Sequence, residues 1–237
     1  MNITGDYHTH SKYSKLHHGK NTIKQMVEKA EDLGLVSYGL SDHGPKHLPF
    51  GIKRKNILKA KQELEEMKKT SKVNLFFGIE ANIIGRDGSI DLTKEEINNL
   101  DILLVGYHRG SPNNFVCLFR KLFNRKKQKQ INTEAYLNCL DKYDIDIITH
   151  LNDHCPVDVY KVACKAKEKG TLIELNNKHI KFTPTQAKEL LDSGCNFILS
   201  SDAHHKNNIA KLDRVLEFVE KYNIPHDRIV NLDKVYK

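Results

Sequence analysis

The sequence has 237 residues, of which 39% are hydrophobic and 29% charged, and its formal net charge is +8. This composition excludes a disordered chain, and the length fits one large α/β barrel or two smaller domains. No apolar run approaches the roughly 18 residues of a membrane-spanning helix. The excess positive charge comes mainly from lysines mixed with glutamates, a pattern that gives no firm indication of a nucleic-acid partner.

Short β-rich runs alternate with helical patterns along the chain. The runs typical of buried strands are 2–8, 36–43, 75–83, 102–108, 146–150, 171–177 and 196–204. Helical patterns are expected near 21–34, 53–71, 132–143, 156–169, 183–193 and 207–222, with Gly34, Gly170 and Gly194 where helices should end. Such alternation is typical of a parallel sheet, and seven strands in a single domain over residues 1–237 favour a barrel over a doubly wound sheet.

Side chains that can bind metals stand at the ends of the predicted strands. Six of them lie at or near the carboxyl end of a predicted strand: His8, His43, Glu80, His108, His150 and Asp202. A parallel barrel builds its active site at the carboxyl ends of its strands. Residues two apart on a strand face the same side, so His8 with His10, and Asp202 with His204, can each act as a pair. Imidazole and carboxylate without thiolate suit Zn, Mn or Fe, and so many ligands suit two or three ions.

Six motifs in this order resemble those of PHP-domain (polymerase and histidinol phosphatase) phosphoesterases: HTH, SDHG, GIEANI, GYH, THLND and SDAH. The likeness is greatest to the small stand-alone YcdX-like phosphatases and runs from Asp6 to about Lys234. It implies a distorted barrel of seven β/α units with its metal site at the carboxyl ends of the strands. It also implies three divalent metal ions, most commonly Zn, with Mn and Fe as alternatives.

The resemblance assigns nine side chains to these ions. The first ion would take ligands from three strand ends: His8, His10, Asp202 and the bridging Glu80. The second would share Glu80 and take His108 and His150. The third would take His43, His204 and one of the adjacent His17 and His18. The segment after HTH is longer than usual, and the match through HGK favours His18.

A surplus of metal charge over two carboxylates favours an anionic substrate and a metal-bound hydroxide. We therefore expect hydrolysis of small phosphate monoesters, histidinol phosphate among them, with Glu80 and Asp202 in the catalytic centre. Arg109 follows His108 and is either a bidentate ligand for the substrate phosphate or part of a salt bridge at the barrel rim.

Two other functions compete with this hypothesis. An amidohydrolase-type hydrolase also begins with HxH and ends with an aspartate, but the SDHG histidine and His204 favour the PHP pattern. A non-enzymatic, metal-loaded module that binds nucleic acid or a polymerase is the second alternative. The five scattered cysteines indicate reduced thiols and a cytoplasmic protein.

Two further features have no assigned chemistry. Residues 115–130 mix apolar and basic side chains. We favour a helical insertion with a solvated basic face, and the alternatives are a lid, an anion-binding patch and an interfacial membrane helix. The remaining histidines are expected at the surface or behind the ligands, with His179 and His205 nearest the site: His47, His154, His179, His205 and His226. Asn176 is expected to order a loop or a ligand.

Overall fold

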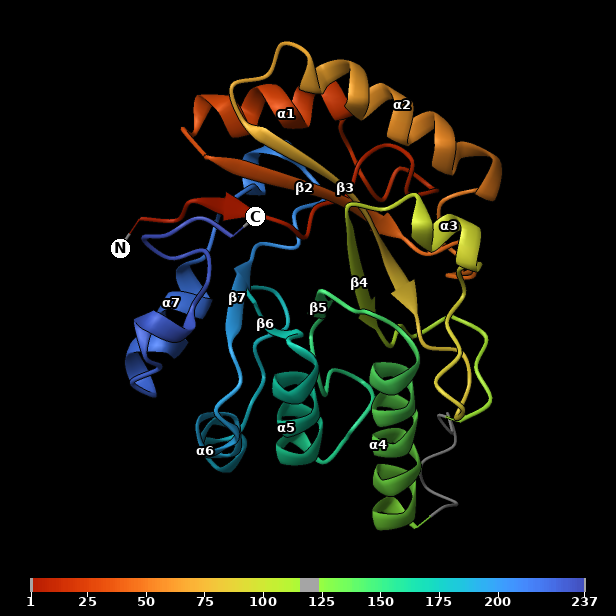
Figure 1. Cartoon of the computed structure of the whole chain (residues 1–237), viewed down its shortest axis with the longest axis vertical. Coiled ribbons are helices and arrows are strands. Elements are labelled where there is room, and N and C mark those ends of the chain that lie inside the picture. Colours follow the sequence, from red (N-terminus) through yellow and green to blue (C-terminus); the bar gives the residue numbers. More distant parts are fainter. Residues whose placement is uncertain (1, 116–123, 237) are drawn as a thin grey trace.

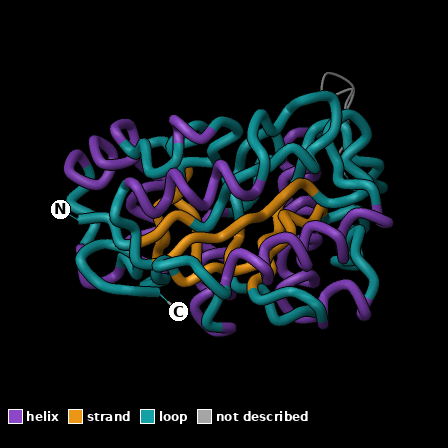
Figure 2. The backbone as a smooth tube through the Cα atoms, turned by 90° about the horizontal axis from the view of Figure 1, so that it is seen from above, coloured by secondary structure: helices purple, strands orange, loops and turns teal. Residues whose placement is uncertain are grey.

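The computed structural model describes residues 2–115 and 124–236. Its strands lie side by side in the order of the sequence: β1 (Gly5–Asp6), β2 (Ser37–His43), β3 (Asn74–Asn82), β4 (Ile102–Gly106), β5 (Ile147–Ile148), β6 (Leu172–Asn176) and β7 (Phe197–Ser200). Every neighbouring pair is parallel. Helices surround these strands when the molecule is seen from above (Figure 2). A distorted α/β barrel of seven parallel strands was predicted, and the observed strands confirm it by forming a nearly closed barrel.

In the described ranges, six helices lie between successive strands and pack outside them (Figure 1): α1 (Ile23–Asp32), α2 (Ile57–Lys68), α3 (Lys94–Asn98), α4 (Arg125–Lys142), α5 (Val159–Lys169) and α6 (Pro184–Ser193). A further helix, α7 (Asp213–Lys221), follows the last strand. Thr22, Thr93 and Thr183 begin three of them with reciprocal capping boxes. Gly170 and Gly194 end α5 and α6 with positive φ, as expected of glycine. The short α3 was not predicted.

The basic segment 115–130 only partly falls within the described residues, since 116–123 lie outside them. Its last part forms the first turns of α4, which begins about two turns earlier than predicted. The Asn124 side chain caps this start by accepting hydrogen bonds from the amides of Lys126 and Lys127. None of the helices in the described ranges combines the length and apolarity needed to cross a bilayer.

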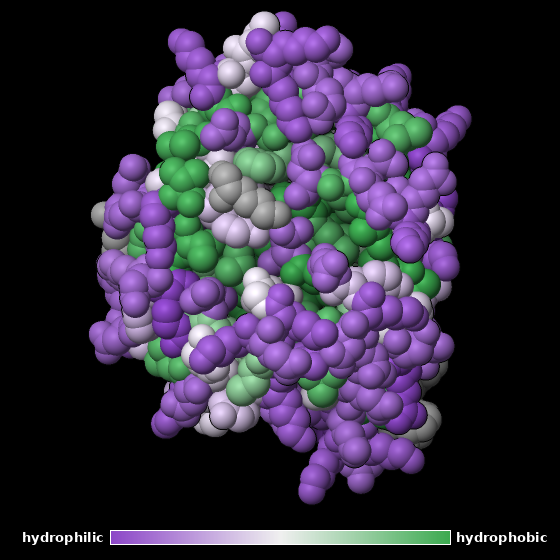
Figure 3. Space-filling model, viewed as in Figure 1, coloured by the Kyte–Doolittle hydropathy of each residue, from purple (hydrophilic) through white to green (hydrophobic). Residues whose placement is uncertain are grey.

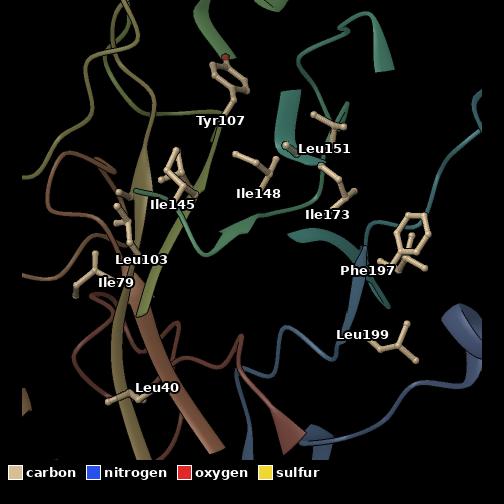
Figure 4. Packing of buried hydrophobic residues seen from close by; sticks show 14 of the residues in the cluster. Leu40, Ile79, Leu103, Tyr107, Ile145, Ile148, Leu151, Ile173, Phe197 and Leu199 are labelled. Carbon is tan, nitrogen blue, oxygen red and sulfur yellow. The ribbon is translucent and has the colours of Figure 1, made fainter. Parts of the chain in front are cut away.

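Alternate residues of each strand face the barrel interior and the surrounding helices. The outward-facing side chains join the larger core, of which Leu40, Ile79, Leu103, Ile173 and Leu199 appear in Figure 4. Inward-facing residues near the amino ends form a second apolar cluster: Tyr7, Ile102, Leu104, Ile147, Leu172 and Ile198. In the view of Figure 3, hydrophilic residues cover most of the periphery and hydrophobic ones show mainly toward the middle. The inner cluster forms an apolar floor below the polar residues at the other end.

The seam between β7 and β1 is closed by two different devices. At the carboxyl end, the His10 amide donates to the Ala203 carbonyl at 2.8 Å, within a bridge between Thr9 and Ala203. At the amino end, Asn231 stands between the strands, and its Nδ2 donates to the carbonyls of Gly5 and Leu199 at 2.8 Å each. Its Oδ1 accepts from the Leu199 amide at 3.0 Å. A side chain therefore supplies the pairing that a regular strand ladder would provide.

Candidate metal centre

A pocket of about 310 Å³ opens at the carboxyl ends of the strands. Most of its wall is imidazole, contributed by His18, His43, His47, His108, His150, His154, His179 and His204. The other lining side chains are Phe50, Tyr107, Arg109, Asp153, Lys178 and Asp202. His8, His10 and Glu80 lie fully buried beneath it. The end of the barrel predicted from the sequence thus gathers the predicted residues.

Glu80, on β3, is at the centre of this group. Its Oε1 lies 2.8 Å from His150 Nε2, 3.0 Å from His108 Nε2 and 3.2 Å from His8 Nε2. Its Oε2 lies 2.8 Å from His43 Nδ1 and 3.8 Å from His10 Nε2. One carboxylate therefore faces imidazoles from both sides, which is the arrangement that a carboxylate shared by two cations requires.

Asp202 forms a second focus on the opposite side of His10. Its Oδ1 lies 3.4 Å from His10 Nε2 and 3.2 Å from His204 Nδ1. Both His10 and Asp202 are buried, whereas His204 faces the pocket. His204 Nε2 in turn lies 3.4 Å from His43 Nε2, which links the two foci.

The local backbone turns these side chains into the pocket. Thr9 points away from the site, since its hydroxyl donates toward Tyr38 Oη at 2.6 Å. His8 and His10 consequently share the opposite face, as the spacing of HTH predicts. His150 and Asp202 have φ angles of 28° and 55°, a region that non-glycine residues rarely adopt. Backbone strain of this kind is typical of functional sites.

Within the described residues, three groups of side chains have their ligand atoms within 4.8 Å of one another: His8–His10–Asp202, His10–His43–His204 and His43–Glu80–His108. The first contains three of the four ligands implied for the first metal and lacks the bridging Glu80. The other two differ from the implied sets, because His10 joins His43 and His204 and because His43 replaces His150. The imidazole rings lie so close together that His10 and His43 each belong to two of these groups.

The hydrogen bonding of these buried atoms suits a site that binds cations. Among the described residues, several buried ring nitrogens of this site have no hydrogen-bond partner: His8 Nε2 and both ring nitrogens of His10. Native proteins rarely leave such atoms unpaired. A donor set of imidazole nitrogens and carboxylate oxygens suits Zn, Mn or Fe, so the residues present fit divalent metal ions.

Burial and neighbouring charges set the protonation of the ligands. Burial, with His43 and His204 close by, lowers the pKa of His10 well below its ordinary value, and burial likewise lowers the pKa of His43. Burial works against the charged form of Glu80, but His108 and His8 outweigh it and hold the pKa well below the usual range. A neutral imidazole and an ionised carboxylate are the forms that bind metals.

The structure places the adjacent His17 and His18 differently. His17 is exposed, whereas His18 lines the pocket and stacks on Phe50 with ring centroids 3.7 Å apart. The His18 ring centroid lies 4.1 Å from that of His204. Burial, His204 and Lys178 lower the pKa of His18 to about 3, which keeps its ring neutral. This placement favours His18 over His17 as the third ligand.

Arg109 is exposed and lines the pocket. His47, His154 and His179 line the same pocket, whereas His205 and His226 begin short 3-10 turns. His179 Nδ1 lies 2.9 Å from Asp153 Oδ2, so a carboxylate orients that ring. Asn176 Nδ2 donates to Asp202 Oδ2 at 3.3 Å, which agrees with its expected role behind a ligand.

Sequence reasoning assigned no role to several charged groups of the site, among them Asp153, Lys178 and Glu174. Lys178 Nζ lies 3.2 Å from Asp202 Oδ1 and 2.5 Å from His204 Nδ1. Glu174, on β6, is fully buried, and its Oε1 lies 2.6 Å from His8 Nδ1. The available signal was a glutamate within a strand predicted to be buried, because charged residues are almost never fully buried unless they are paired.

Comparison with known proteins places this centre within a family. The model of the PHP domain matches residues 6–193, which is well over half of the chain. The chain belongs to the PHP domain family. Its similarity to other members extends beyond the matched region: a probable phosphatase from Acetivibrio thermocellus is 29% identical, over 98% of this chain and 92% of that protein. A probable phosphatase from Clostridium novyi is 30% identical, over 99% and 92%.

Solved structures share the fold of this PHP protein. The zinc-containing histidinol phosphate phosphatase of Lactococcus lactis, complexed with L-histidinol and phosphate, has a TM-score of 0.64 over 99% of both chains, at 14% identity. A putative histidinol phosphatase of Listeria monocytogenes has a TM-score of 0.63 over 87% of this chain and 97% of that one, at 12% identity. The predicted family and barrel are confirmed, as is the predicted class of enzyme, a phosphatase.

Proposed function

We propose that this PHP-family phosphatase hydrolyses small phosphate monoesters in a pocket that holds up to three divalent transition-metal ions, with Zn as the first choice. The observation that carries the proposal is the convergence of His8, His43, His108 and His150 on the single carboxylate of Glu80. A buried carboxylate among this many imidazoles, several of them without hydrogen-bond partners, is explained by bound cations.

Each proposed ligand set follows from the residues already described. One ion would take His8, His10, Asp202 and one oxygen of Glu80. A second would share Glu80 with His108 and His150. A third would be held on the pocket side by His18, His43 and His204. When bound, such ions supply Lewis-acid stabilisation and activate water for attack on phosphorus.

The side chains around the mouth suit an anionic substrate. We propose that Arg109 binds non-bridging phosphate oxygens, because a guanidinium matches two such oxygens in a plane. Lys178, which lies beside Asp202 and His204, adds a second cation within the same pocket. A volume of about 310 Å³ is at the lower end of the range for small-molecule sites, which favours small phosphate esters over polymers.

The first ester to test is histidinol phosphate, because zinc, L-histidinol and phosphate are bound to the Lactococcus lactis protein of the same fold. The purified chain, loaded with Zn or Mn, is assayed against a panel of phosphate monoesters and diesters, an amide and a lactone. We expect phosphate release from monoesters and two to three metal ions per chain by elemental analysis. Absence of metal after reconstitution, or hydrolysis of the amide or lactone alone, would overturn the proposal.

A further inference from the structure

Glu174 connects two of the proposed ligands from behind. It lies on β6 with its side chain fully buried inside the barrel. Its Oε1 is 2.6 Å from His8 Nδ1. Its Oε2 accepts hydrogen bonds from the His150 amide at 2.7 Å and from Asn176 Nδ2 at 3.0 Å. One carboxylate therefore contacts the ring of the first ligand and the backbone of the second.

The contact with His8 determines which ring nitrogen is available to a metal. A His8 ring that binds a metal is neutral, and an ionised carboxylate can only accept, so that ring must carry its proton on Nδ1. The lone pair is then on Nε2, which faces Glu80 Oε1 at 3.2 Å and has no hydrogen-bond partner. Carboxylates commonly fix the tautomer of metal-binding histidines in this way.

The contact with His150 acts on the backbone. His150 has a φ of 28°, which ordinary residues avoid, and Glu174 Oε2 holds the amide of that same residue. The conformation directs His150 Nε2 toward Glu80 Oε1 at 2.8 Å. Asn176 extends the network, because its Nδ2 reaches both Glu174 Oε2 and Asp202 Oδ2. Three proposed ligands thus depend on one short polar network.

We infer that Glu174 is a positioning residue of the metal centre, which sets the tautomer of His8 for one ion and the backbone of His150 for the neighbouring ion. The inference rests on the proposed function, since it concerns the same ions. It gives Glu174 no contact with substrate and no part in proton transfer.

Glu174→Gln tests the inference because it would place a hydrogen-bond donor opposite His8 Nδ1, which itself donates. Two donors, the His150 amide and Asn176 Nδ2, converge where Oε2 stands, so the amide oxygen of the glutamine would take that place. The glutamine NH₂ group would then face His8 Nδ1, which must accept, and the proton of the ring would move to Nε2. We expect the affinity for the ion at His8 to fall about 10- to 100-fold, the usual cost of removing such a partner.

The measurements are metal binding by titration against a chromophoric chelator, and the tautomer of His8 by NMR of ¹⁵N-labelled histidine rings. A purely structural role would leave the tautomer unchanged. Glu174→Asp keeps the charge and both acceptors with a shorter reach, so we expect it to retain the Nδ1–H tautomer and more of the affinity than glutamine. Asp146→Asn is the matched control: Asp146 accepts from the Leu103 amide at 2.8 Å before the start of β5, at the other end of the barrel.

The outcomes separate this inference from the proposed function. If the unaltered chain binds no metal, the proposed function fails. If it binds metal and Glu174→Gln binds equally well with the Nδ1–H tautomer, or if Asp146→Asn loses as much affinity, only the inference is overturned. Should Glu174→Gln fail to fold by circular dichroism, Glu174→Asp decides: affinity equal to that of the unaltered chain contradicts the inference, and a weaker ion at His8 supports it.

Discussion

His150 Nε2 lies 2.8 Å from Glu80 Oε1, although the two residues are 70 positions apart in the sequence. Glu80 belongs to β3, and His150 follows β5. The contact is made across the open end of the barrel, where each strand contributes a side chain to the same small volume. The chemistry proposed for this site therefore depends on the geometry of the whole barrel end.

Glu80→Gln should lower phosphomonoesterase activity by orders of magnitude while the barrel remains folded. Glutamine keeps the shape but removes the charge and one of the two acceptor oxygens that the proposed ions share. Turnover of an aryl phosphate and metal content are the measurements, with circular dichroism as the folding control. Glu66→Gln, at an exposed position on α2, should leave both unchanged. Near-normal activity in folded Glu80→Gln would argue against a bridging role.

His18→Ala and His17→Ala should differ sharply. His18 lines the pocket against Phe50, whereas His17 is exposed. We expect His18→Ala to lose one metal ion and most activity, and His17→Ala to retain both. Elemental analysis and the same phosphatase assay give the answer, and the reverse pattern would transfer the ligand role to His17.

Removal of metal should destabilise the fold. The ions would bind only the native arrangement of ligands, and a ligand at 100 times its Kd contributes about 2.7 kcal/mol to stability. For a chain of this size, that corresponds to a fall in Tm of roughly 5–10 °C on chelation. Calorimetric scans with and without a chelator, followed by re-addition of Zn, measure the change. A Tm that is indifferent to chelation and to Zn would contradict the proposed centre.

Arg109→Met should weaken substrate binding and leave the metals in place. The guanidinium lines the pocket, and an arginine side chain has no acceptor atom with which to bind a metal ion. We expect KM to rise roughly tenfold or more, since a charge-assisted contact is worth about 1.5–3 kcal/mol. Arg86→Met, which removes a surface ion pair with Glu134, is the control. An unchanged KM would mean that Arg109 lies at the rim of the barrel without binding the substrate.

Asn231→Ala should destabilise the barrel through its seam. The substitution leaves the carbonyls of Gly5 and Leu199 and the Leu199 amide without partners in a fully buried position. Unpaired buried groups cost about 1–3 kcal/mol each, so the free energy of unfolding should fall by about 3 kcal/mol. Urea titration measures it, with Asn98→Ala on the exposed side of α3 as the control. A loss below about 1 kcal/mol would mean that water or backbone shifts replace these bonds.

The sequence predicted most of the site because strand ends and metal-capable residues coincide. His8, His43, Glu80, His108, His150 and Asp202 needed only the rule that parallel strands end at one face. Every predicted strand is present, although β1 and β5 are each limited to two regularly paired residues. The longer predictions failed there because the chain turns into loops that carry ligands, as the positive φ of His150 indicates.

Other features depended on long-range contacts that no local pattern records. The charged Glu174 is paired with His8, 166 positions away, and its pKa is held below the ordinary value although burial alone would raise it. The role of Asn231 depends on two strands at opposite ends of the sequence. The start of α4 was missed because its first turns are basic and carry no apolar periodicity.

The seam between β7 and β1 also bears on the order in which parts of the molecule can form. Asn231 and Gly5 are 226 positions apart, and their hydrogen bond joins the first strand to a segment that follows the last. Contacts so distant in sequence form late, since the intervening chain must first be ordered. His8 and His10 on one side of the seam can meet Asp202 and His204 on the other only after the last strand, β7, has been synthesised. The proposed ligands on the two sides of the seam are therefore brought together only when most of the barrel has been made, and a metal that needs both sets would bind late in folding.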